Sequence, residues 1–173
     1  MYKRQYFNWP TREEEAYVRE YQKRMQMQVQ KMMADETLRR IVSSHQGLMH
    51  PEEYSERFLD KPEYFTALLV YCQAKGIPFS GYLRKLIGTK GKLPGMDAHW
   101  MEVLLQGVLY EDRESYTMME AERESLLQEL KEAGAIYRNK VALRDNEAIK
   151  KVLMKSQGKM ESIHTIVQAE YEA

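Results

Sequence analysis

The sequence of 173 residues is poor in cysteine, proline and glycine, and it has no long apolar run. Cys72 is the only cysteine, so no disulfide can form within the chain. The longest wholly apolar run, Ala67–Cys72, is far shorter than the about 20 residues that cross a bilayer. The N-terminus also lacks the apolar core of a signal peptide. These absences predict a cytoplasmic protein with no membrane partner, in which Cys72 is a buried thiol.

Charge is balanced over the whole chain, with 26 Lys and Arg against 26 Asp and Glu, but its distribution is uneven. Residues 1–50 carry nine basic and six acidic side chains, and residues 51–95 carry seven and five. Residues 96–173 carry ten basic and fifteen acidic side chains. The basic residues 1–95 are compatible with anion binding. Attraction between this basic part and the acidic residues 96–173 is a second interpretation, and an uneven solvated surface is a third.

The nine glycines and five prolines separate segments whose apolar residues recur every three or four positions, which predicts helices. Thr11 and Glu14 form a capping box for the first helix. Its apolar stripe has a break near Asp35 and ends at Gly47; the stripe consists of Val18, Tyr21, Met25, Val29, Met32, Leu38 and Ile41.

Further helix boundaries follow from the same breakers. A short helix is expected over Pro51–Leu59, and later helices open at Pro62, Ser80 and Asp97. Gly76 and Gly88 end two of these helices. No alternating pattern of convincing length predicts a sheet.

Beyond Asp112 the chain is highly charged, and its apolar residues form narrow seams. The first seam is Tyr116, Met119, Leu126 and Leu130, which becomes heptad-like if Arg123 fills the missing position. The second seam is Ile149, Leu153, Ser156, Met160, Ile163 and Val167. Two antiparallel helices joined by Gly134–Asn146 are the simplest arrangement, with the second seam packing inside the chain or in a homodimer or other oligomer.

These patterns predict an all-α protein, a compact bundle of short helices followed by a longer C-terminal helical hairpin. We expect an N-terminal segment over residues 1–10, a helical core domain over 11–110, and the hairpin, for packing or oligomerisation, over 111–173. The first five residues, MYKRQ, resemble the translated end of a sequencing adapter from assembled environmental DNA. An ordinary basic N-terminus is the alternative, and these residues enter no argument about sites.

The sequence of residues 56–87 predicts a helix, a tight turn and a second helix. The turn and the second helix carry a Gly-Ile turn, a serine cap and an amphipathic end with Arg and Lys: Ala74-Lys75-Gly76-Ile77, Ser80, Tyr82-Leu83-Arg84 and Leu86-Ile87. This pattern resembles the helical part of ribbon-helix-helix DNA-binding proteins, and the resemblance implies contact with DNA. In that family a strand before the first helix reads the DNA, whereas the corresponding YSERFLD forms a helix equally well. A purely structural helical hairpin is the alternative.

Four cations gather where the second helix of this pair ends, in the sequence RKLIGTKGK. The predicted nucleic-acid-binding residues are Arg84, Lys85, Lys90 and Lys92. Flexible glycine backbone with ammonium and guanidinium groups suits phosphate contact, although the spacing is not that of a P-loop. A solvated basic loop is the alternative.

Patterns for catalysis and metal binding are missing. There is no G-x-S-x-G, and Cys72 lies in an apolar helix. The four histidines, His45, His50, His99 and His164, show no paired spacing, and Glu161-x-x-His164 is only one of the two such motifs that a di-iron bundle needs. We therefore expect no enzyme, no metal and no cofactor.

The function that these observations favour is a non-enzymatic nucleic-acid-binding accessory protein that contacts DNA or RNA through its basic front half. By analogy of size and pattern alone, such proteins occur among the accessory factors of phages and mobile genetic elements. The alternative is a protein-binding adaptor or inhibitor, for example a phage-encoded counter-defence protein, that acts through helical surfaces. A structural homo-oligomer is the third hypothesis.

Overall fold

The computed structural model describes residues 10–88, 92–147 and 149–155. These residues are predominantly helical, which confirms the all-α prediction. The elements are α1 (Arg12–Ala34), α2 (Glu36–Ser43), α3 (Gln46–Met49), α4 (Ser55–Asp60), α5 (Pro62–Lys75), α6 (Gly81–Leu86), α7 (Ala98–Gln106), the π-helix η1 (Gly107–Glu111), the 3-10 helix η2 (Arg113–Met119) and α8 (Glu120–Glu132). Two short strands, β1 (Ile136–Tyr137) and β2 (Lys140–Val141), pair in antiparallel orientation. None of the described helices combines the length and apolar character that a membrane span requires.

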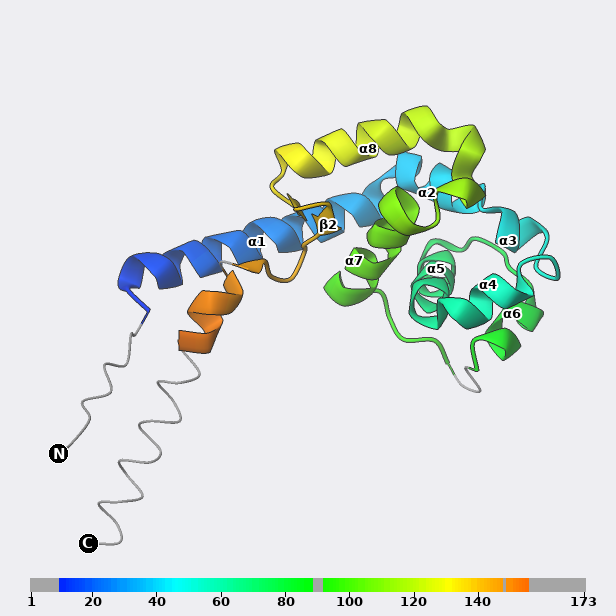
Figure 1. Ribbon diagram of the computed structural model, residues 1–173, viewed down its shortest axis with the longest axis horizontal. Helices are drawn as coiled ribbons and strands as arrows, with labels where there is room; N and C mark the ends of the chain where they lie inside the picture. Colours follow the sequence, from blue (N-terminus) through cyan, green and yellow to red (C-terminus); the bar gives the residue numbers. More distant parts are fainter. Residues whose placement is uncertain (1–9, 89–91, 148, 156–173) are drawn as a thin grey trace, which may run out of the picture. The chain divides into compact units, whose positions relative to one another are not determined.

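The chain divides into two compact units, and the larger one comprises Met25–Arg144. Within it α5 packs against α2, α4 and α7, while α8 packs against α2, η1 and η2 (Figure 1). Every residue of the apolar run Ala67–Cys72 is buried. A helix that is apolar on all sides requires neighbours on all sides, which explains why this run forms the centre of the core.

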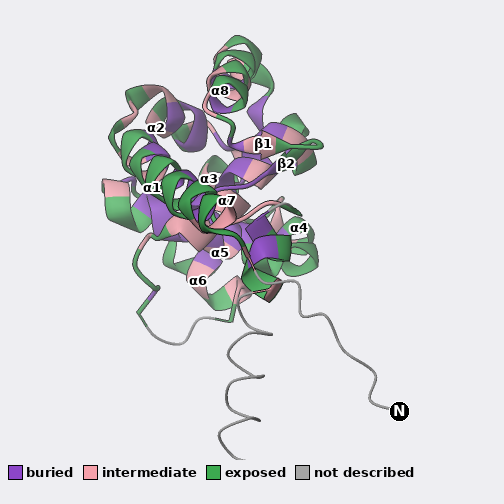
Figure 2. Ribbon diagram, turned by 90° about the vertical axis from the view of Figure 1, so that its left-hand side faces the viewer, coloured by how far each residue is buried: buried purple, intermediate pink, exposed green. Residues whose placement is uncertain are grey.

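The smaller unit combines Met1–Arg24 with Asp145–Ala173. Its described parts are the first turns of α1 and a helical segment over residues 149–155. Lys155 Nζ lies 2.7 Å from Glu14 Oε1 and ties this segment to the start of α1. Most residues of α1 are exposed (Figure 2).

Capping signals in the sequence are confirmed one by one. The Thr11 N–H donates to Glu14 Oε2 over 2.9 Å, and the Glu14 N–H donates to Thr11 Oγ1 over 3.1 Å, which is the predicted capping box. Asp35 caps α2 after the predicted break, and Asp97 accepts from the Trp100 N–H at the start of α7. Gly76 ends α5 with a φ of 65°, a left-handed conformation that favours glycine.

Several predicted details are wrong. Gly47 does not end the second helix: α2 ends at Ser43 with Ser44 as its C-cap, and Gly47 is buried inside α3. The helix expected over Pro51–Leu59 covers only Ser55–Asp60, after turns at 51–54. The first seam does not begin in an α-helix, because η2 is a 3-10 helix with a kink at Tyr116.

The predicted C-terminal helical hairpin is described only in part. Its connection, Gly134–Asn146, is not a plain loop, because it contains the pair β1–β2. Residues 156–173 lie outside the described residues, so the hairpin stays a prediction, as does the domain division at residue 110. Arg123 is buried together with Leu126 and Leu130 on α8, as the first seam required.

Candidate functional site

The predicted basic site lies at the end of the helix pair α5–α6. Ser80 caps α6 by accepting from the Tyr82 N–H over 3.2 Å, as expected from the sequence. The Ile77 N–H donates to Cys72 O over 2.8 Å, and this bond closes the tight turn behind Gly76. These local bonds fix the position from which the cations of α6 extend.

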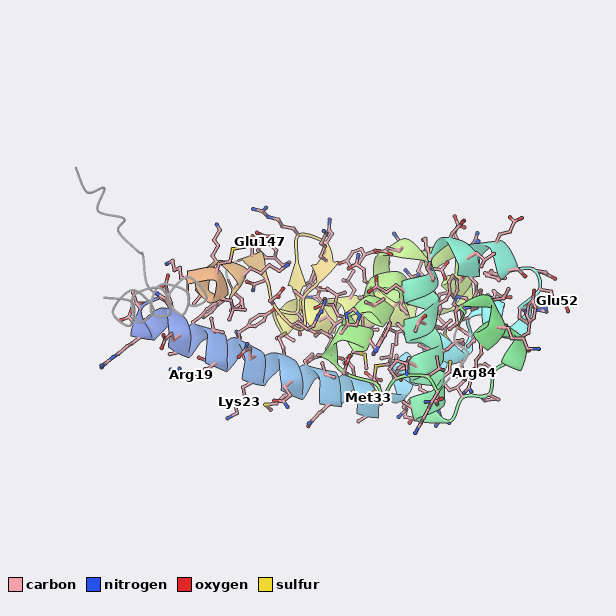
Figure 3. The ribbon with its side chains drawn as sticks, turned by 90° about the horizontal axis from the view of Figure 1, so that it is seen from below. Arg19, Lys23, Met33, Glu52, Arg84 and Glu147 are labelled. Atoms are coloured by element: carbon pink, nitrogen blue, oxygen red, sulfur yellow. The ribbon has the colours of Figure 1, made fainter. Side chains whose placement is uncertain are left out.

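Arg84 contacts the side chains of Gln73 and Phe79. Its Nη2 donates to Gln73 Oε1 over 3.0 Å, and its guanidinium carbon lies 5.4 Å from the centre of the Phe79 ring. Figure 3 labels the side chain of Arg84. Lys85 and Lys92 are exposed, and neither has an ion-pair partner within the described part of the chain. Lys90, the fourth predicted residue, lies outside the described residues.

Helix α4 packs against α6 and carries exposed acidic side chains. Glu56 and Asp60 are exposed on α4, and Glu52 and Glu53 are exposed just before it. Ser55 Oγ lies 3.3 Å from the Tyr82 hydroxyl and joins the two helices. The surroundings of the basic site are therefore of mixed charge. The segment that corresponds to the ribbon-helix-helix strand forms α4 in this chain, and the resemblance itself stays a prediction.

The second predicted site, the seam of the last helix, is only partly described. Ile149 is fully buried, whereas Leu153 is 37% exposed and its neighbour Val152 is buried. Met160, Ile163 and Val167 lie outside the described residues. The role of this seam in packing or oligomerisation therefore stays a prediction.

A buried polar cluster inside the larger unit was not predicted. His45 Nδ1 accepts a hydrogen bond from the Gly47 N–H over 2.9 Å, so the ring proton sits on Nε2. Nε2 lies 2.8 Å from Asp112 Oδ2 and donates to it. His45 is fully buried and Asp112 is 6% exposed. The two residues are 67 positions apart, so no local motif could have shown the pairing.

Four more side chains surround this pair. Ser115 Oγ donates to Asp112 Oδ1 over 2.9 Å. The hydroxyls of Tyr64 and Tyr116 lie 2.6 Å apart and share a hydrogen bond in which either can be the donor. Arg57 reaches Asp112 from the surface, with Nη1 3.5 Å from Oδ1.

The pKa values of the cluster reflect burial and hydrogen bonding together. Burial alone would raise the pKa of Asp112, but the hydrogen bonds from His45 and Ser115 more than offset this effect and lower the pKa. Burial raises the pKa of Tyr64 and Tyr116 well above the usual phenol value. Asp112 is thus an ionised acceptor that is bonded by His45 and Ser115 and lies near the Arg57 guanidinium.

The π-helix η1 delivers Asp112 to this cluster. The Asp112 N–H donates to Gly107 O over 2.9 Å, the wide turn that defines a π-helix. A Cβ on Gly107 would lie 2.0 Å from Cε2 of Tyr64, so only glycine fits here. Arg123 is buried and its Nε donates to Val108 O over 2.8 Å, which satisfies a carbonyl of this segment.

The hydrogen bonds of this cluster connect α3, the end of η1 and η2. Ser115 bonds Asp112 and not His45, so the arrangement that activates a serine nucleophile is not present in these three residues. Both ring nitrogens of His45 are engaged by the protein. A surface pocket of about 490 Å³ opens next to it, and its charged walls include Arg57, Lys61, Asp112 and Glu114.

The described residues also contain one thiol, that of Cys72, which is buried. Burial raises the pKa of the Cys72 thiol to about 12, which confirms the predicted buried thiol and leaves it protonated at neutral pH. The described segments bring together no group of three or more His, Cys, Asp or Glu residues able to hold a metal ion. Comparison of the chain with models of known protein families, with curated protein sequences and with solved structures finds no match.

Proposed function

We propose that this chain is a non-enzymatic nucleic-acid-binding accessory protein whose main contact is the end of the α5–α6 helix pair. The observation that supports it is the state of the cations there. Lys85 and Lys92 are exposed without a carboxylate partner among the described residues. Cations that are presented in this way remain available to phosphate oxygens.

The acidic residues on α4 argue for a contact of limited strength. Exposed carboxylates close to a phosphate backbone repel it, so only a few phosphates are expected to be neutralised. Each phosphate contact changes the slope of log affinity against log salt by about 0.9 on duplex DNA and about 0.7 on a single strand. Affinity should therefore be measurable at low salt and fall only moderately as the salt concentration rises.

The experiment is fluorescence anisotropy with a random duplex DNA, a single-stranded DNA and an RNA, each at low and moderate salt. Replacing Arg84, Lys85, Lys90 and Lys92 with alanine should weaken binding at low salt and flatten the salt slope by about three units on duplex DNA. The matched control replaces Arg19, Lys23, Lys150 and Lys151, which are also exposed, with alanine. It removes the same charge and should retain most of the binding. Wild-type protein that binds none of the three nucleic acids at low salt would overturn the proposal.

A second function, that of a protein-binding adaptor or inhibitor, is favoured by one apolar surface. Leu59 on α4 is 61% exposed and Tyr82 on α6 is 41% exposed, and the two helices pack together. Apolar and aromatic side chains with a charged rim are typical of protein interfaces. A photo-crosslinking residue at position 82 should capture the partner in cells, whereas the same residue in place of Tyr17, which is 45% exposed, should not. Equal capture at both positions would refute this surface as the interface.

A further inference from the structure

The β1–β2 hairpin has a turn built from unusual residues. Its two central residues, Arg138 and Asn139, both have positive φ values, 49° and 60°. Two such residues in a two-residue hairpin loop mark a type I′ turn, which prefers Asn-Gly or similar pairs. Asparagine suits this conformation, but an arginine in it costs about 1–2 kcal/mol. Local stability therefore does not explain the arginine at this position.

The base of the hairpin is firmly held. The Val141 N–H donates to Gln106 Oε1 over 3.0 Å, and the Leu143 N–H donates to Glu102 Oε2 over 2.9 Å, so both bonds lead to α7. The Ala142 N–H donates to Ala135 O over 2.8 Å, and all of Ala135 and Val141–Leu143 are buried. Because the base is fixed, the tip holds a defined position at the surface.

The tip presents cations and an aromatic ring to solvent. Residues 137–140 are all exposed (Figure 2). The guanidinium carbon of Arg138 lies 5.2 Å from the centre of the Tyr137 ring. Neither Arg138 nor Lys140 is ion-paired with any carboxylate of the described residues. A planar cation held over an aromatic ring, with an ammonium group two residues away, matches the groups that stack on and neutralise nucleic acid.

We propose that the hairpin tip is a second nucleic-acid contact, specific for unpaired nucleotides. An unpaired base stacks on the Tyr137–Arg138 pair, and Lys140 contacts a neighbouring phosphate. An unpaired base suits this tip better than a duplex does, because the bases of a duplex are already stacked on one another. The short tip also presents few other side chains that could contact a groove of the duplex. The proposal rests on the proposed function, since it assumes that the chain binds nucleic acid.

The test uses a substitution that separates binding from stability. Arg138→Gly suits the left-handed turn, so the melting temperature should stay equal or rise. Loss of the stacked guanidinium should weaken binding of a short single-stranded oligonucleotide at least about fivefold. Duplex affinity should change no more than in the control Arg40→Ala, which removes one exposed charge from α2. Tyr137→Ile keeps a strand-forming residue and should weaken single-strand binding in the same way.

The outcomes distinguish this proposal from the proposed function. Wild-type protein that binds neither single strands nor duplex overturns both. If wild type binds and Arg138→Gly binds single strands as well as Arg40→Ala does, the tip is not a contact, while the proposed function stands. An equal loss for duplex and single strand would also overturn the specificity for unpaired bases. If Arg138→Gly lowers the melting temperature, Arg138→Asn is the substitute, since asparagine also accepts this conformation.

Discussion

Replacing Asp112 with asparagine removes the charge at the centre of the buried cluster and keeps the size of the side chain. The carboxylate accepts hydrogen bonds from His45 and Ser115. An asparagine amide must turn its NH₂ group toward at least one of these donors. Hydrogen bonds to a charged group contribute about 1.5–3 kcal/mol each, and removing one partner of a buried pair costs about 3–5 kcal/mol. We expect the free energy of unfolding to fall by about 3 kcal/mol, or roughly 6–12 °C in melting temperature.

The assay is urea unfolding followed by circular dichroism, with the same substitution elsewhere as the control. Asp60 is exposed and has no ion-pair partner among the described residues, so Asp60→Asn should change stability by less than about 0.5 kcal/mol. If Asp112→Asn is as mild as Asp60→Asn, the cluster contributes little to stability and the reasoning fails.

The same variant also predicts a dependence on pH. The pKa of Asp112 is lower in the folded protein than in the unfolded chain, so its carboxylate stabilises the fold above the unfolded value. This contribution is lost as the pH falls from about 4 through the folded pKa. The stability difference between wild type and Asp112→Asn should therefore shrink over that range. A difference that remains constant there would contradict an ionised Asp112.

Three further predictions concern packing, reactivity and assembly. Gly107→Ala should cost at least about 2 kcal/mol, because the new Cβ meets the Tyr64 ring, whereas Gly81→Ala, with open space around it, should be neutral or slightly stabilising in the same unfolding assay. Cys72, with a pKa of about 12, should not react with a thiol reagent at neutral pH until denaturant unfolds the protein; rapid reaction of the folded protein would contradict its burial. If the last helix joins two copies, light scattering should show a dimer that Leu153→Glu converts to a monomer, while a monomeric wild type that this substitution unfolds would place the seam inside the chain.

Features that depend on neighbours in sequence could be predicted without the structure. Thr11 and Glu14 are three residues apart, and Gly76 and Ser80 each act on a helix that begins or ends beside them. The buried run Ala67–Cys72 followed from composition alone, since six consecutive apolar residues leave no polar face for solvent. Such signals are reliable because the interacting groups are held together by the chain itself.

The buried cluster and the hairpin were decided by tertiary structure. His45 and Asp112 have no spacing that links them, and they meet because α3, which His45 caps, packs against η2, which Asp112 precedes. Once water is excluded there, each polar group must find a partner, and this requirement selects the tautomer of His45 and the donors around Asp112. The two-residue strands of the hairpin are too short for an alternating pattern, and they persist because their backbone groups bond to Gln106 and Glu102 on α7. The sequence thus determined where helices begin, end and bury their apolar faces, while contacts between distant segments determined which polar groups are paired.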